Sequence, residues 1–409
     1  MTKLIWVIFA IFATSCASSV DFSEGRPIPK SVSQLPTVQV FLDKQGDFYN
    51  FDKLGAEQKL INNSDKSLIC EYNKALCKKT HEQIYSLCNT SETPDLINEN
   101  CELKNIYQDW RKEQSDEVDK IVTNVLTQLD KTSNKTIVML IHGFRVPNAG
   151  QDYRKVKSLL MNDRGNQDSP LFLEVHWDGR QSPTLPISAL KAWEPAQWTA
   201  PVVGFRLRSL LNKLHNGLDH TKPKPGLFVL THSTGAVVAG SLFGNPKAAL
   251  PCLKNESEAS ECGPNYTEYF MADTYNDPHV KVPQWPNLNL VMLAPATTQT
   301  TFFVSDDTAL GFQGNAGSNL IFSLSKKDNA LNKYINEPRL KGYSGLGANE
   351  EELDAIVEGL SQANPKRANV QILKVSEDLG TEHAFTEYMQ TRQFHKALQL
   401  LWTPVPKLK

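Results

Sequence analysis

The sequence predicts an α/β fold in which a mostly parallel, doubly wound sheet is flanked by helices. Two observations support this prediction. From Thr136 onward, short apolar runs alternate with stretches of helical length, a pattern typical of strands joined by crossover helices. The 409 residues are also enough for one large domain with an appended segment. In such a sheet, the functional site is expected beyond the carboxyl ends of the strands.

The strands and helices follow one another along this domain, which we expect to cover residues 131–409. The predicted strands are the short apolar runs, at 137–141, 171–177, 227–231, 288–293, 319–324 and 370–375. The predicted helices lie at 152–161, 201–215, 235–243, 350–360 and 383–401.

The first 17 residues have the layout of a secretory signal peptide. Lys3 precedes an apolar run, residues 4–12, and small residues follow it. Residues 13–16, Ala-Thr-Ser-Cys, resemble a bacterial lipobox, in which Cys16 is lipidated and becomes the new N-terminus. Ordinary cleavage after Ala17 is the alternative. We expect an exported protein that a lipid anchors to the cell envelope, in the outer membrane or periplasm, with simple secretion as the alternative.

Two segments separate the signal from the large domain. Residues 18–36 are rich in Ser and Pro and are predicted to be a tether. Residues 37–130 contain polar helical patterns and four cysteines, and we interpret them as a helical accessory or cap segment.

Cysteine usage favours export, because six cysteines remain when Cys16 is set aside, and an even number suits disulfides. Nested pairing of four of them would staple a helical hairpin, and the last two would close a short loop. Metal binding is the competing interpretation, although the spacings lack a repeated Cys-x-x-Cys. The predicted pairs are Cys70 with Cys101, Cys77 with Cys88, and Cys252 with Cys262.

Charge argues against a nucleic-acid partner. The formal net charge is −2, and the basic residues are scattered along the chain. A nucleic-acid-binding protein needs a stripe or patch of Lys and Arg, and we expect none here.

The strongest chemical signal is a nucleophile elbow at Ser233. A buried strand, 227–231, runs into His232, Ser233 and Thr234 and then into a helix of small residues that begins at Gly235. Such a turn strains the Ser backbone and lifts its hydroxyl above the sheet. Thr231 stands where the usual motif has its first Gly. A structural turn without chemistry is the competing interpretation.

A second strand end supplies a candidate oxyanion site. Residues 138–145 form a strand that ends in His142-Gly-Phe before a helix. Backbone N–H groups at such turns stabilise the negative oxygen of a tetrahedral intermediate, and we assign this role to Phe144 and Thr234. His142 and His232 are interpreted as structural residues rather than bases.

The order of the remaining groups follows nucleophile, acid, base. Asp328 comes soon after the strand at 319–324 and is the predicted acid, and His383 follows the last strand and is the predicted base. For Asp328 the alternative is a carboxylate that only caps the turn 328–333. The competing acids are Asp306, Asp307 and Asp378, and the competing base is His395.

Taken together, these residues resemble the alpha/beta-hydrolase superfamily, most closely a group of bacterial esterase-like proteins whose elbow reads Thr-His-Ser-x-Gly. The resemblance covers roughly 136–402 and includes Ser325-x-x-Asp328-x-Ala-Leu. It implies the alpha/beta-hydrolase fold and a triad of Ser233, Asp328 and His383. The chain departs from the group at 294–296, Ala-Pro-Ala, where relatives tend to carry an Asp after Ala-Pro.

The resulting hypothesis is a serine hydrolase that cleaves carboxylic esters through an acyl-enzyme, without metal or cofactor. A membrane tether suits lipid or cell-envelope esters as substrates. Trp193, Pro195 and Trp198 are candidates for a lid before the helix at Pro201, or for ordinary core residues. The alternative function is a non-catalytic binding or structural envelope lipoprotein, because the fold also hosts such proteins.

Overall fold

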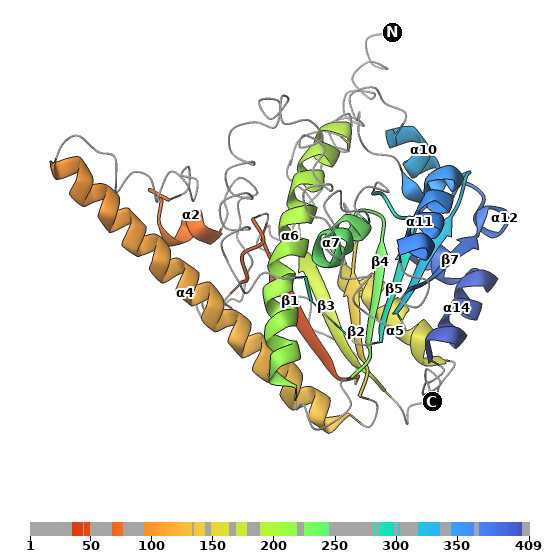
Figure 1. The fold of residues 1–409 in the computed structure, drawn as a ribbon, viewed down its shortest axis with the longest axis horizontal. Helices are drawn as coiled ribbons and strands as arrows, with labels where there is room; N and C mark the ends of the chain where they lie inside the picture. The colour runs from red at the N-terminus through yellow and green to blue at the C-terminus, as the bar shows by residue number, and fades with distance from the viewer. Residues whose placement is uncertain are drawn as a thin grey trace, which may run out of the picture.

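The structure is a computed structural model of the full chain (Figure 1). It describes residues 35–43, 45–49, 68–76, 94–132, 135–143, 149–162, 169–177, 189–218, 225–244, 282–283, 285, 287–297, 302, 318–335, 345–363 and 368–402. The predicted signal peptide with Cys16 and most of the predicted tether lie outside these residues.

Within the described residues, the fold centres on a sheet of seven strands, all parallel, in the order β1-β3-β2-β4-β5-β6-β7. The chain adds β3 on one side of β2 and then crosses to place β4 on the other side, so the winding direction reverses between β2 and β4. The strands are β1 (Thr37–Leu42), β2 (Ile137–Ile141), β3 (Leu171–Trp177), β4 (Leu227–His232), β5 (Leu288–Leu293), β6 (Ser318–Leu324) and β7 (Ala368–Lys374).

The first strand differs from the sequence prediction. Residues 37–42 were assigned to the accessory segment, but they form β1, an edge strand that pairs in parallel with β3 from Thr37 opposite Phe172 to Leu42 opposite Trp177. The sheet therefore begins well before residue 131. The pairing joins residues about 135 positions apart, and no local pattern reveals such a partner.

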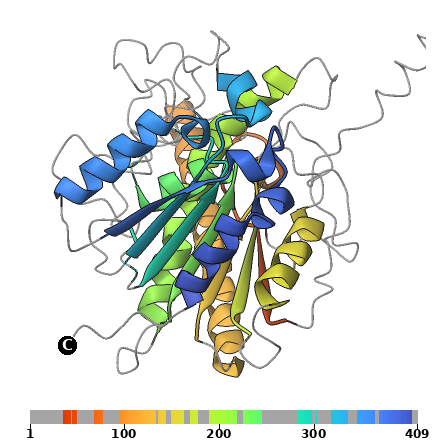
Figure 2. The same ribbon diagram turned by 90° about the vertical axis from the view of Figure 1, so that its right-hand side faces the viewer.

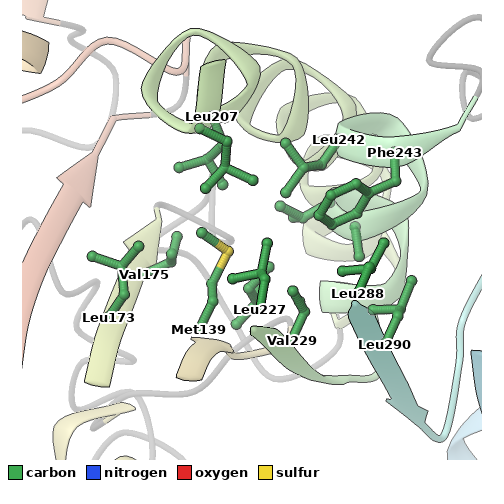
Figure 3. Close-up of a cluster of buried hydrophobic side chains, with 14 of the residues drawn as sticks. Met139, Leu173, Val175, Leu207, Leu227, Val229, Leu242, Phe243, Leu288 and Leu290 are labelled. Carbon is green, nitrogen blue, oxygen red and sulfur yellow. The ribbon is translucent and has the colours of Figure 1, made fainter. Parts of the chain in front are cut away.

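One face of the sheet is covered by α6 (Ala189–Gly217), α7 (Gly235–Phe243), α11 (Glu350–Ala363) and the later part of α4 (Pro94–Lys131). Every second residue of the central strands points to this face, for example Met139 on β2 and Val229 on β4, where they meet Leu207 of α6 and Phe243 of α7 (Figure 3). This alternation follows from the two-residue period of a strand. The result is a large apolar core on this side of the sheet.

The opposite face packs against α5 (Ala149–Asn162), α10 (Asn329–Ile335), α13 (Phe385–Met389) and α14 (Arg392–Trp402), with α12 (Ser376–Leu379) and the 3-10 turn η8 (Leu346–Ala348) nearby (Figure 2). The intervening strand residues, such as Val138, Leu140 and Leu230, belong to this second core. A sheet buried on both faces explains why the strands read as continuous apolar runs rather than as alternating ones.

Helix α4 begins far from the sheet and runs diagonally toward it (Figure 1). Its earlier part contacts α2 (Leu68–Tyr72) through a small separate cluster that includes Ile69, Leu103 and Trp110. Its later part, with Val118 and Val125, enters the main core. No helix among the described residues is long and apolar enough to cross a membrane.

Of the six cysteines predicted to form disulfides, two lie within the described residues. Cys70 lies buried in α2, and Cys101 lies partly buried in α4. Cys77, Cys88, Cys252 and Cys262 lie outside the described residues, so all three pairings stay predictions.

Two helices differ from their predicted bounds. Helix α6 begins at Ala189 rather than at Pro201, so the three candidate lid residues lie on the helix itself. The predicted helix 383–401 is two helices, α13 and α14, separated at Thr391. The Thr391 hydroxyl donates to the Tyr388 carbonyl at 2.8 Å and accepts from Phe394 N–H at 3.3 Å, and such side-chain capping starts a new helix.

Candidate active site

The candidate site lies where the winding of the sheet reverses. Ser233 follows β4 directly, and His142 and Gly143 follow β2, the strand next to it. Asp328 and His383 come after β6 and β7, at the same edge because all strands run in parallel. Crevices outside the carboxyl ends of strands, at such a reversal, are the usual ligand sites of open α/β sheets.

Ser233 forms a strained turn between strand and helix. Its φ of 52° lies in the left-handed region, where residues other than Gly are uncommon. Two backbone hydrogen bonds hold the turn. The N–H of Ser233 donates to Leu293 O at 2.9 Å, and the carbonyl of Ser233 accepts from Ala296 N–H at 3.2 Å. Gly235 allows the helix to approach β2, because a Cβ there would lie 2.7 Å from Ile141 O.

Three of the predicted residues form a connected chain of hydrogen bonds. Nδ1 of His383 lies 2.7 Å from Oδ2 of Asp328, and Nε2 of His383 lies 3.1 Å from Oγ of Ser233. An ionised carboxylate only accepts hydrogen bonds, so Nδ1 carries the proton and donates it. Nε2 is then the acceptor for the Ser233 hydroxyl, which is the tautomer that a general base needs.

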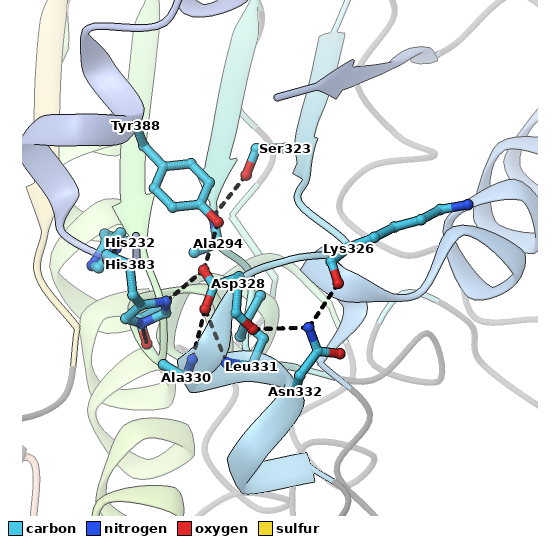
Figure 4. A network of polar contacts seen from close by, with 11 residues as sticks. His232, Ala294, Ser323, Lys326, Asp328, Ala330, Leu331, Asn332, His383 and Tyr388 are labelled. Atoms are coloured by element: carbon cyan, nitrogen blue, oxygen red, sulfur yellow. Dashed lines mark hydrogen bonds and ion pairs between the residues drawn. The ribbon is translucent and has the colours of Figure 1, made fainter. Parts of the chain in front are cut away.

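Asp328 uses its two oxygens for different partners (Figure 4). Oδ1 accepts from the backbone N–H groups of Ala330, at 2.9 Å, and Leu331, at 3.0 Å, at the start of α10. Oδ2 accepts from His383 and from the Tyr388 hydroxyl, which donates at 2.6 Å. The side chain therefore caps a helix and also contacts the imidazole of the predicted base, so it does more than cap the turn.

The environment of Asp328 keeps the group ionised. Burial by itself raises the pKa of this carboxyl, but the hydrogen bond and charge of His383, together with the Tyr388 hydroxyl and Leu331 N–H, outweigh burial and lower it. Burial and the neighbouring Asp328 charge raise the pKa of Tyr388. Tyr388 thus remains a hydroxyl donor.

His142 is held by structural hydrogen bonds. Its Nε2 accepts from Trp177 N–H at 3.3 Å, so Nδ1 carries the proton and donates to Gly143 O at 2.7 Å. Burial lowers the pKa of His142 to about 3. Its ring also stacks on Trp177, with centroids 5.5 Å apart. With both nitrogens occupied, His142 has no free atom for proton transfer.

One of the two proposed oxyanion donors lies within the described residues. Thr234 is buried directly before α7, and its backbone N–H forms no hydrogen bond with any described residue. Free N–H groups are expected in the first turn of a helix and attract negative charge. Phe144 lies outside the described residues, so its role stays a prediction.

The segment at which the sequence departs from its resembled group contacts the elbow. Ala294 has a φ of 46°, and its N–H donates to Ser323 Oγ at 2.7 Å. Ala296 donates to the Ser233 carbonyl, and the Pro295 carbonyl accepts from Gly347 N–H at 2.9 Å. This segment supports the nucleophile turn through its backbone.

The competing acids and base are not brought to Ser233 by any described contact. Asp378 is exposed on α12, and His395 lies on α14. Asp306 and Asp307 lie outside the described residues. Tyr388 was not singled out from the sequence, because the predicted helix 383–401 gave no reason to choose one of its aromatic residues. No group of His, Cys, Asp and Glu suited to hold a metal ion occurs in the described parts of the chain.

Comparisons with known proteins give a limited result. No protein-family model and no curated protein matches the chain. Among solved structures, the chain is similar to a carboxylesterase from Bacillus cereus, with 14% identity, a TM-score of 0.31, and coverage of 66% of this chain and 88% of that chain. It is also similar to esterase 2 from Thermogutta terrifontis, with 10% identity, a TM-score of 0.30, and coverage of 66% and 82%.

Proposed function

We propose that this protein is a serine hydrolase of the alpha/beta-hydrolase type that cleaves carboxylic esters through an acyl-enzyme. The observation that supports the proposal is the hydrogen-bonded series Ser233, His383, Asp328 at a strained elbow. Nucleophile, base and orienting acid within hydrogen-bond reach are the diagnostic arrangement for an activated serine.

In the proposed mechanism, Ser233 Oγ attacks the ester carbonyl carbon while its proton passes to Nε2 of His383. Asp328 stabilises the resulting imidazolium through Nδ1. The negative oxygen of the tetrahedral intermediate accepts from Thr234 N–H and from a second donor, which we assign to Phe144. Collapse of the intermediate returns the proton to the leaving alcohol. Water then repeats the sequence on the acyl-serine, releasing the acid and free Ser233.

The test is hydrolysis of p-nitrophenyl acetate, butyrate, octanoate and palmitate by the purified protein. Ser233→Ala and His383→Ala are expected to abolish turnover above the background rate. Asp378→Asn is the matched control, because this exposed carboxylate lies near the base in sequence without contacting it, and it should retain wild-type activity. A folded wild-type protein that hydrolyses no ester would favour the binding or structural lipoprotein instead.

The proposal includes attachment to the cell envelope through Cys16, which would bring the site close to lipid or envelope esters. It rests on the lipobox-like residues 13–16. Incorporation of labelled palmitate into the wild-type protein, and its loss in Cys16→Ser, is the expected result in a bacterial host. Equal labelling of both proteins, or labelling of neither, would contradict lipidation at this residue.

A further inference from the structure

His232, the residue before the nucleophile, has a buried imidazole that the mechanism above does not use. Side chains alternate along β4, so His232 lies on the same face as Phe228 and Leu230, toward α5, α13 and α14. This face also carries the short loop that bears His383. One residue of the elbow thus reaches toward the base rather than toward the hydroxyl.

The ring of His232 is enclosed by its neighbours. Phe385 stacks on it with centroids 5.1 Å apart and planes 13° apart, and Tyr388 meets it nearly edge-on at 6.0 Å. Its Nδ1 faces Gly143, where a Cβ would approach to 3.3 Å. Because the ring is packed against aromatic residues of α13, its hydrogen-bonding direction is fixed.

The remaining nitrogen, Nε2, lies 2.7 Å from the backbone carbonyl of His383. A carbonyl only accepts, so Nε2 carries the proton and donates it. Burial, reinforced by the neighbouring His383, lowers the pKa of His232 to about 3. The ring therefore stays neutral, and its Nε2–H tautomer is maintained by the carbonyl.

The residues on either side of the base are held by backbone hydrogen bonds, from Glu382 N–H to Leu379 O at 3.2 Å and from Tyr388 N–H to Ala384 O at 3.2 Å, but His383 itself is held less. His383 lies between α12 and α13, outside regular structure, and its side chain is 27% exposed. Among the described residues, the bond from His232 is the one hydrogen bond made by the His383 backbone. The position of the imidazole relative to Ser233 depends on where this backbone lies.

We propose that His232 is a positioning residue, whose Nε2–H holds the His383 carbonyl and so fixes the base against the nucleophile of the same elbow. The inference rests on the proposed serine hydrolase function. It requires no contact between His232 and substrate. Its expected effect is on kcat, because displacements of about 1 Å in a catalytic group can cost roughly a hundredfold in rate.

The test compares His232→Gln with His232→Leu. The Gln side chain can place an N–H donor near the position of Nε2, whereas Leu fills much of the space without a donor. Rates on p-nitrophenyl butyrate are divided by the concentration of sites titrated with a fluorophosphonate, which removes any loss of folded protein. We expect His232→Leu to lower kcat per site about 30-fold to 100-fold with KM little changed, and His232→Gln to recover most of that loss.

Two kinetic outcomes would overturn the positioning role while leaving the proposed function intact. These are a His232→Leu variant as active per site as the wild type, and a His232→Gln variant as slow as His232→Leu. A wild-type protein that is inert in both assays contradicts the proposed function, and the positioning role with it.

Side-chain ¹H–¹⁵N correlation spectra give a readout that does not depend on activity or on the Leu variant folding. We expect His232 to carry its proton on Nε2 in both wild type and Ser233→Ala. A proton on Nδ1 would overturn the inference.

Discussion

At the scale of single residues, Asp328 shows how one side chain can stabilise both a helix and a base. Oδ1 accepts from two N–H groups of α10, while Oδ2 accepts from His383 and Tyr388. The sequence could place Asp328, His383 and Ser233 near one another, because each follows a strand and parallel strands end at one edge. It could not reveal His232 or Tyr388 as partners, because their contacts join residues 151 and 60 positions apart.

Because Oδ1 and Oδ2 of Asp328 have different partners, two substitutions of this residue are expected to have different consequences. In Asp328→Asn, the amide oxygen can still cap α10, but the NH2 group would face Nδ1 of His383 and force the ring proton onto Nε2. A protonated Nε2 cannot accept the hydrogen bond from the Ser233 hydroxyl. We expect kcat to fall about 10³-fold to 10⁴-fold, with little change in the free energy of unfolding.

Asp328→Ala should lose a similar amount of activity and also destabilise the fold by about 1 kcal/mol through loss of the cap. Steady-state kinetics and urea unfolding of both variants measure the two effects separately. Substantial activity in Asp328→Asn would contradict the role assigned to Oδ2.

At the scale of elements, the elbow joins β4 to α7, and the start of α7 lies so close to the end of β2 that a residue with a side chain does not fit at Gly235. A Cβ at Gly235 would lie 2.7 Å from Ile141 O and 2.8 Å from His142 O, both backbone atoms of the adjacent β2 segment. The sequence predicted this close approach from the small residues around Ser233. It did not reveal β1, because an edge strand is defined by its pairing with β3, and that partner is distant in the chain.

The crowding at the elbow predicts that Gly235→Ala destabilises the protein by about 1–3 kcal/mol and sharply lowers activity, because the helix must shift away from the nucleophile. Gly226, just before the same strand, is the matched control, since its nearest neighbour to an added Cβ is 3.9 Å away. Gly226→Ala should change the free energy of unfolding by no more than about 0.5 kcal/mol. Thermal unfolding and ester hydrolysis of Gly235→Ala and Gly226→Ala measure these effects. Equal losses of stability and activity in the two variants would contradict the packing argument.

At the scale of the whole molecule, the edge of the sheet carries a buried charge network. Glu174 of β3 accepts from Lys157 of α5 at 2.6 Å and from Gln39 of β1 at 2.9 Å, and both charged side chains are almost fully buried. Burial raises the pKa of Glu174, but hydrogen bonds and charge from His176 and Lys157 outweigh it and hold the pKa at about 2. This network ties β1 and α5 to the rest of the sheet.

The lowered pKa of Glu174 predicts a specific sensitivity to acid. A carboxyl with a folded-state pKa below its unfolded value contributes stability above the unfolded pKa and loses it as pH falls through the folded pKa. For Glu174 the window runs from about pH 4.5 to about 2, and the contribution is about 3 kcal/mol.

Urea unfolding measured across this window should show a shallower loss of stability in Glu174→Gln than in wild type. Glu351→Gln is the control, because this carboxylate is exposed on α11, where solvent screens its charge. It should follow the wild-type profile, and a Glu174→Gln profile parallel to that of wild type would contradict the assignment.

The measurement that tests the central claim most directly is covalent labelling with a fluorophosphonate, followed by mass spectrometry of the labelled peptide. An activated serine is predicted to yield one adduct, on Ser233, in the wild-type protein, and none in Ser233→Ala or His383→Ala. An unlabelled but folded wild-type protein, or an adduct on another serine, would contradict the claim that Ser233 is the nucleophile of a hydrolase.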